Sequence, residues 1–140
     1  MTVEKPKAAP VVGVILTALA VLLFGGLSTF AGPCTSHDAA DTPMCFWAFR
    51  AMLGAGAVLV VLSIVRIFET DEGERRGLSL GAALLGALIA AIPGGLIDLC
   101  SDASMACNAI MRPFALCVGV AVFMVGAIDL TRRLLSLRKR

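Results

Sequence analysis

The stretch VVGVILTALAVLLFGGLSTF, residues 11–30, contains no charged residue. A helix needs about 20 mostly apolar residues to cross the ~30 Å hydrocarbon layer of a membrane. Three further stretches of this kind follow, at about residues 46–68, 78–99 and 113–130. The sequence therefore predicts an all-α integral membrane protein, a four-helix bundle that is built from two hairpins.

The composition of the whole chain agrees with this class. Of its 140 residues, 59% are hydrophobic and 16% are charged, whereas soluble domains carry roughly 45–50% apolar and about 25% charged residues. The formal net charge of +2 is too small to suggest a nucleic acid as a partner. We expect a single transmembrane domain over residues 1–140, in contact with the lipid bilayer.

The basic residues set the expected orientation, because cytoplasmic loops carry an excess of Lys and Arg. Ten of the twelve lie on the side of the two termini and the connection 69–77, whereas Arg50 and Arg112 lie on the other side. We therefore expect both termini and the inner loop 69–77 in the cytoplasm, and the outer loops 31–45 and 99–112 on the opposite side. The first span exceeds the ~7–15 apolar residues of a signal peptide, so we expect an uncleaved helix.

The two halves of the chain share a pattern of Gly, Cys and Arg residues. The first half contains Gly25-Gly26-Leu27, Cys34, Met44-Cys45 and Arg50, and the second contains Gly94-Gly95-Leu96, Cys100, Met105-Ala106-Cys107 and Arg112. In both halves the Arg lies five residues after the second Cys. We interpret this pattern as an internal repeat of two hairpins with the same orientation.

Four of the five cysteines, Cys34, Cys45, Cys100 and Cys107, fall in the two outer loops. Thiols on an oxidising side of a membrane suggest disulfide bonds. The simplest pairing closes each loop on itself, as Cys34–Cys45 and Cys100–Cys107, but four cysteines permit three pairings. Cys117 lies inside the fourth span, and we interpret it as a small apolar packing residue.

Two other interpretations of the loop cysteines stay open. The four thiols could form the redox pairs of a quinone-linked membrane thiol–disulfide oxidoreductase, although the chain contains no C-x-x-C motif. They could also help to bind a soft metal such as copper or zinc, for which thiolate, thioether and imidazole groups are suitable ligands. The candidate metal ligands are Met44, Cys45, Met105, Cys107 and His37.

Charged and small residues supply further candidate contacts. We expect Arg50 and Arg112 to pair with carboxylates of the outer side, such as Asp98, near the membrane interface. In the third span, small residues recur every four positions, at Ala83, Ala87, Ala91 and Gly95. A stripe of this kind lets a second helix approach closely. We expect the stripe to form a seam within the bundle or a docking face for a partner protein.

Residues 29–53 and 92–119 resemble a bacterial family of small four-span membrane proteins, which is described as a domain of unknown function. Its members carry a Cys and a Met-x-Cys element in each outer loop. Residues 105–107 match this element, whereas Met44-Cys45 lacks the spacer residue. The resemblance implies the cytoplasmic (inner) membrane of a bacterial cell envelope and a link to ABC-type export systems, but it implies no activity.

Together these patterns favour a protein that associates with others over an enzyme. The chain lacks the glycine-rich, metalloprotease and nucleophile-elbow motifs of common enzyme classes. We expect an accessory or scaffolding subunit with disulfide-bonded outer loops and no cofactor. Its partner would be a larger envelope complex, such as a transporter, or further copies of the same chain.

Overall fold

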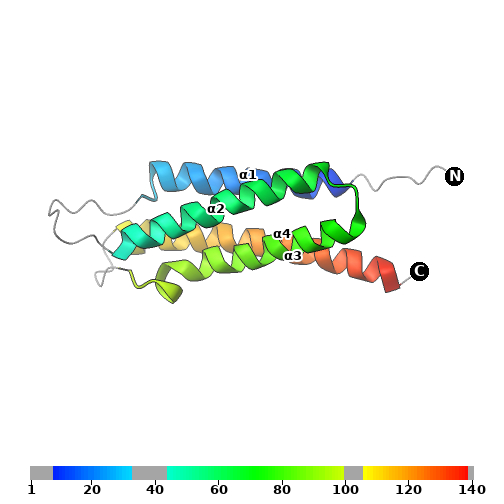
Figure 1. Ribbon diagram of the computed structural model, residues 1–140. Helices are drawn as coiled ribbons and strands as arrows, with labels where there is room; N and C mark the ends of the chain where they lie inside the picture. The colour runs from blue at the N-terminus through cyan, green and yellow to red at the C-terminus, as the bar shows by residue number, and fades with distance from the viewer. Residues whose placement is uncertain (1–7, 33–43, 100–105, 139–140) are drawn as a thin grey trace.

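The computed structural model describes residues 8–32, 44–99 and 106–138 and consists of four helices that lie side by side (Figure 1). The helices are α1 (Ala8–Thr29), α2 (Met44–Phe68), α3 (Glu72–Ala91) and α4 (Arg112–Arg138). Two short π-type turns, η1 (Ile92–Leu96) and η2 (Cys107–Met111), follow α3 and precede α4. These described ranges contain no strand. The predicted all-α bundle is confirmed.

All four helices are long and apolar enough to cross a membrane. The candidate spans are Val11–Thr29, Cys45–Phe68, Glu72–Leu96 and Cys107–Arg138, where the last one includes η2. The chain is therefore a multi-pass membrane protein, as the apolar stretches of the sequence predict.

Successive helices are antiparallel, so the bundle has two distinct ends (Figure 1). We call the end where α1 begins and α4 ends the terminal end, and the end where α1 ends and α2 begins the loop end. The most extensive contacts join α1 to α2 and α3 to α4, and smaller contacts join α2 to α3 and α1 to α4. Hence α2 and α4 occupy opposite corners of the bundle and run in the same direction.

The connection between α2 and α3 is shorter than the predicted loop 69–77, because only residues 69–71 lie outside the helices. Asp71 begins α3 as its N-cap, where its Oδ1 accepts the Gly73 N–H at 2.6 Å. Glu69 Oε1 accepts the backbone N–H groups of Asp71 and Thr70 at 3.0 and 2.9 Å. These bonds, together with one from the side chain of Glu74, lower the pKa of the Glu69 carboxyl.

At the loop end, α3 breaks at Pro93-Gly94. Pro93 has a ψ of 106° and Gly94 a φ of +82°, a value that favours glycine. The Gly94 N–H donates to the Ile97 carbonyl at 2.9 Å, which closes the turn. A Cβ on Gly94 would lie 3.3 Å from Arg112 Cζ, so the guanidinium of Arg112 packs directly on this turn. By contrast, α1 continues through Gly25 and Gly26, the positions that the predicted repeat equates with Gly94 and Gly95.

Glycines bring α3 and α4 into backbone contact. A Cβ on Gly86 would collide with the backbone nitrogen of Phe123. On the facing helix, a Cβ on Gly119 would lie 2.6 Å from the Ala90 nitrogen, and one on Gly126 would lie 2.8 Å from the Ala83 nitrogen. Close approach of this kind is the usual means of helix association in lipid, which offers no hydrophobic drive between helices.

This seam differs from the small-residue stripe that the sequence predicts. Ala83 is buried at the seam, but Ala87, Ala91 and Gly95 are exposed. The buried face of α3 instead comprises Ser79, Ala82, Ala83, Gly86 and Ile89. The glycines of α4 decide which face of α3 packs inward, so the expected intramolecular seam is wrong for three of its four residues.

We expect Gly86→Ala to lower the free energy of unfolding by about 1–3 kcal/mol, the usual cost of overpacking. The added methyl group would meet backbone of α4, which has less freedom to move aside than the end of a side chain. Thermal unfolding of the purified protein in detergent measures the effect. The control is Gly81→Ala on the same helix, where the new Cβ would lie 3.6 Å from Leu62 Cδ1. An equal loss of stability in both variants would contradict the seam.

Candidate functional site

A buried ion pair joins α2 to α4 toward the terminal end of the bundle. Arg66 of α2 is 1% exposed, and its Nη2 lies 2.7 Å from Oδ2 of Asp129 in α4. Nη1 of Arg66 donates to Ser79 Oγ of α3 and to the Arg75 carbonyl, the latter at 3.2 Å. Three helices therefore meet at a single guanidinium group.

The carboxylate of Asp129 gathers further donors. Arg133 Nε donates to Asp129 Oδ2 at 2.8 Å, and Ser79 Oγ lies 2.7 Å from the same oxygen. Arg133 Nη1 lies 2.5 Å from Oε2 of Glu72, whose side chain is 52% exposed. Glu72 also lies 3.9 Å from Nη1 of Arg75, so three arginines share two carboxylates. The buried charges of Arg66 and Asp129 each have an opposite charge beside them, which is the condition under which an apolar bundle can enclose ionised side chains.

This charged cluster fixes the relative positions of α2, α3 and α4. An ionised side chain inside a membrane bundle is costly unless it has a partner. The hydrogen bonds of Arg66 are directional, so a shift of α4 by one turn would leave Arg66 and Asp129 buried without each other. Nε of Arg66 is also buried and has no hydrogen-bond partner among the described residues, so its Nη atoms make all of its side-chain bonds. We assign the cluster a structural role.

Sequence reasoning missed Arg66 and Ser79 as site residues, although the sequence contains a signal for Arg66. The buried residues of α2 recur at intervals of three and four, at Cys45, Ala48, Met52, Ala55, Leu59, Ser63 and Arg66. Arg66 is thus in phase with the buried face, as Asp129 is in phase with Val122 and Gly126 on α4. Two opposite charges on the buried faces of two helices indicate a buried pair.

The predicted pairing of Arg50, Arg112 and Asp98 is not formed in the part of the chain that the structure describes. All three side chains are exposed. The Arg50 Cζ lies 5.4 Å from the centroid of the Phe46 ring, and Arg112 packs on the turn at Gly94. An aromatic face and the end of a helix thus take the place of the expected carboxylate, as both attract cations.

The structure describes only part of the predicted cysteine and metal sites. Cys45 and Cys107 are both 0% exposed. Cys34, Cys100, Met105 and His37 lie outside the described residues, and the side chain of Met44 is not described. The disulfide pairs, the redox pairs and the metal ligands that involve these residues therefore stay predictions.

Cys117, the remaining described cysteine, is exposed rather than packed inside the bundle as expected, because its position on α4 faces away from α1 and α3. No disulfide bond joins two of the three described cysteines. Among residues 8–32, 44–99 and 106–138, no group of three or more His, Cys, Asp or Glu side chains could hold a metal ion.

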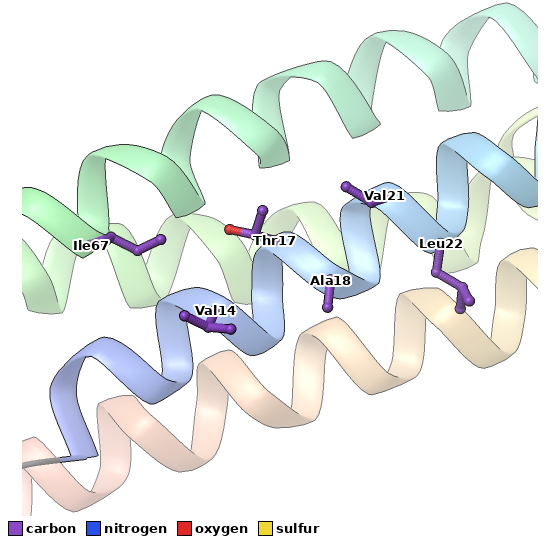
Figure 2. A pocket seen from close by; sticks show the side chains of 6 residues that line it. All are labelled: Val14, Thr17, Ala18, Val21, Leu22 and Ile67. Carbon is purple, nitrogen blue, oxygen red and sulfur yellow. The ribbon is translucent and has the colours of Figure 1, made fainter.

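A shallow groove of about 500 Å³ runs along the outer face of α1 (Figure 2). Its lining comes from α1 and from one residue of α2, and consists of Val14, Thr17, Ala18, Val21, Leu22 and Ile67. Thr17 contributes the only hydroxyl, which lies 2.9 Å from the Gly13 carbonyl and 3.0 Å from Ser63 Oγ. Since this hydroxyl is already bonded within the bundle, the groove offers apolar contact.

Comparison with known proteins gives a family without an activity. A family model described as a domain of unknown function (DUF4418) matches residues 11–132. No curated protein and no solved structure matches the chain.

The charged cluster generates a prediction on stability. We expect Asp129→Leu to lower the free energy of unfolding by about 3–5 kcal/mol, because Arg66 then stays buried without an anion. The double variant Arg66→Met/Asp129→Leu should lose less than Asp129→Leu alone, since it leaves no unpaired charge of that pair. Reversible unfolding in mixed detergent micelles measures the free energies of unfolding of Asp129→Leu, of Arg66→Met and of the double variant, each against the unchanged protein.

The matched control for this prediction is Arg132→Met, which removes an exposed arginine of α4. We expect it to change stability by no more than about 0.5 kcal/mol. If the double variant lost as much as the sum of the two single losses, Arg66 and Asp129 would not be coupled and the structural role of the cluster would be refuted.

Proposed function

Because the chain belongs to the DUF4418 family, whose description names no activity, we propose a function from the surfaces of its own bundle. We propose an accessory or scaffolding subunit of a bacterial cytoplasmic membrane that docks on a larger membrane complex, such as a transporter. The excess of Lys and Arg at the terminal end supports a cytoplasmic position for both termini.

The observation that carries the proposal is a face of α3 that the bundle itself does not use. Ala87 and Ala91 lie on it, four positions apart, and are exposed, whereas Gly95 is exposed beyond the break at Pro93-Gly94. The large side chains beside them, Leu84 and Leu88, are 62% and 42% exposed. Small residues give lipid chains little to pack against, but they allow the backbone of another helix to approach. We call this surface the α3 docking face.

The bundle holds the α3 docking face in a fixed position. On its opposite side, α3 contacts α4 backbone to backbone at Gly86. Near the terminal end of the bundle, Ser79 ties α3 to the ion pair of Arg66 and Asp129. A surface that is rigid before binding loses less conformational entropy when a partner docks, and this supports an assembly role.

A quinone-linked thiol–disulfide oxidoreductase is the second candidate, and the described residues favour it less. Such an enzyme needs a thiolate that its substrate can reach. Cys45 and Cys107 are both fully buried, so a dithiol or a quinone would reach their sulfur atoms only after a helix end had moved.

Photo-crosslinking in the native membrane tests the proposal. A photoreactive amino acid at Leu88, beside the small residues, should give a discrete adduct with another membrane protein, which mass spectrometry identifies. The same amino acid at Val61 of α2, which is 60% exposed, is the matched control and should give adducts with lipid only. Adding Ala91→Ile should reduce the Leu88 adduct at least tenfold, because the branched side chain blocks close approach of a helix.

Adducts with lipid alone at Leu88 would contradict the proposal. An adduct with a second copy of the chain would show that the partner at the α3 docking face is another copy of this chain and not a larger complex. Leu84→Ile, which keeps a large side chain beside the α3 docking face, should leave the Leu88 adduct unchanged.

A further inference from the structure

The groove on the outer face of α1 is built into the packing of α1 on α2, and we call it the α1 groove (Figure 2). A Cβ on Gly13 would lie 2.7 Å from Ile67 Cγ1, so the glycine lets the side chain of Ile67 lie close against α1. Thr17 Oγ1 lies 3.0 Å from Ser63 Oγ, which holds the two helices together at the groove. Ala18 keeps the groove open, because its side chain is smaller than those one turn before and after it. The groove therefore exists before any ligand binds.

The α1 groove has about the length of the hydrocarbon of one membrane leaflet. Its lining on α1 extends from Val14 to Leu22, which is about 12 Å of helix. Half of the ~30 Å hydrocarbon layer is ~15 Å. The span Val11–Thr29 has its middle at Ala20, so the groove begins near the terminal end and ends close to the bilayer midplane. An acyl chain ends there as well, whereas a helix of a partner protein would continue through the other leaflet.

The lining of the α1 groove also suits a hydrocarbon chain. Its volume of about 500 Å³ lies within the range of about 300–1,000 Å³ that is usual for ligand sites. All of its lining residues except Thr17 are apolar, and the Thr17 hydroxyl is already bonded to Gly13 and Ser63. A polar group in the groove would therefore lose its hydration without gaining a free partner among the lining side chains.

Contacts between the helices place two arginines just beyond the end of the α1 groove that lies near the terminal end. Arg66, which precedes the groove residue of α2, contacts both Asp129 and Ser79, so these three residues share a depth. Arg132 follows Asp129 by three residues on α4, which ends at the terminal end. Arg76 precedes Ser79 by three residues on α3, which begins there. Each arginine therefore lies about 4.5 Å farther toward the terminal end than the charged cluster.

Arg76 and Arg132 have no ion-pair partner among the described residues. The described carboxylates of this end are already bonded, either to other arginines, to backbone N–H groups or to one another: Asp129, Glu72, Glu69, Asp71 and Glu74. Nε of Arg76 is also buried without a hydrogen-bond partner. Basic residues near a membrane surface attract anionic headgroups, and each contributes about fivefold in affinity. The layer beyond the groove therefore favours a lipid with a negative headgroup.

We propose that the α1 groove binds one acyl chain of an anionic phospholipid, whose phosphate lies at the depth of Arg76 and Arg132. This lipid exchanges more slowly than the lipids around the rest of the bundle, because the groove is preformed and its binding orders no part of the protein. The site is separate from the α3 docking face, since α1 and α3 occupy opposite corners of the bundle. It thus adds a bound lipid to the proposed assembly role and does not depend on that role.

Native mass spectrometry of the full-length protein in a mild detergent tests the proposal. The protein is incubated with equal amounts of phosphatidylglycerol and phosphatidylcholine that carry the same acyl chains. It should retain one phosphatidylglycerol per chain, with a preference of at least about fivefold over phosphatidylcholine. Glycerol phosphate at the same concentration should not displace the lipid, because it offers the headgroup chemistry without an acyl chain.

Variants of the α1 groove test the acyl-chain site. Ala18→Leu fills the groove and should lower the retained lipid at least about tenfold, because the added atoms overlap the chain. Ala18→Ser keeps the groove open and should retain the lipid. The matched control is Ala57→Leu, at an exposed alanine of α2 that does not line the groove, and it should also retain the lipid. Ala18 is itself exposed, so these variants should fold, and thermal unfolding checks this.

Variants of the arginines test the headgroup preference separately. Arg76→Gln/Arg132→Gln should make the retention of phosphatidylglycerol and phosphatidylcholine equal. The matched control is Arg50→Gln/Arg112→Gln, which removes two exposed arginines of the loop end. These arginines lie at the other end of the bundle from the groove mouth, so the control should keep the preference.

Four results would overturn the proposal. They are equal retention of the two lipids by the unchanged protein, equal losses in Ala18→Leu and Ala57→Leu, displacement of the lipid by glycerol phosphate, and a protein adduct from a photoreactive amino acid at Val21 beside the groove. None of these results bears on crosslinking at Leu88, so the bound lipid and the proposed assembly role can fail independently.

Discussion

The contact between Arg66 and Asp129 is the constraint on which the arrangement of the bundle depends. Two full charges inside an apolar bundle leave little freedom, because only one alignment of α2 and α4 brings them together. That alignment places Ser79 beside both charges. It also sets the depth at which Gly86 meets Gly119 across the seam between α3 and α4. Packing in lipid is otherwise tolerant of sliding, so a polar pair supplies the specificity that apolar surfaces lack.

The two faces of α3 show how small residues can be divided between internal and external use. Gly86 and Ala90 face α4, whereas Ala87 and Ala91 lie one position further along the helix and face outward. A helix this rich in Ala and Gly can approach neighbours on several sides. The position of α4 therefore decides which face of α3 packs inside the bundle and which one remains for a partner.

The sequence was sufficient to predict the four spans, because their apolar length is a property of the chain alone. The sites could not be predicted in the same way, because they depend on which residues of each helix face inward. The inward face in turn depends on the register between the helices. Alanines occur on both faces of α3, so the recurrence of small residues at every fourth position could not identify the buried face. Arg66 was predictable in principle from its phase with Cys45, Met52 and Leu59, whereas Arg50 and Arg112 drew attention by their spacing from cysteines. Cys34 and Cys100 lie outside the described residues, so the disulfide prediction is tested only by experiment.

The long separation between Arg66 and Asp129 also has a consequence for biosynthesis. At roughly 5–20 residues per second, a ribosome needs about 3 to 13 s to make the 63 residues between them. During that interval Arg66, which lies in the last turn of α2, has no anion on α4 to pair with. The pairing that fixes α2 against α4 is therefore completed only when α4 arrives. A truncated chain that lacks α4 would display an unpaired cation, which a membrane protease or chaperone could recognise as a mark of incomplete synthesis.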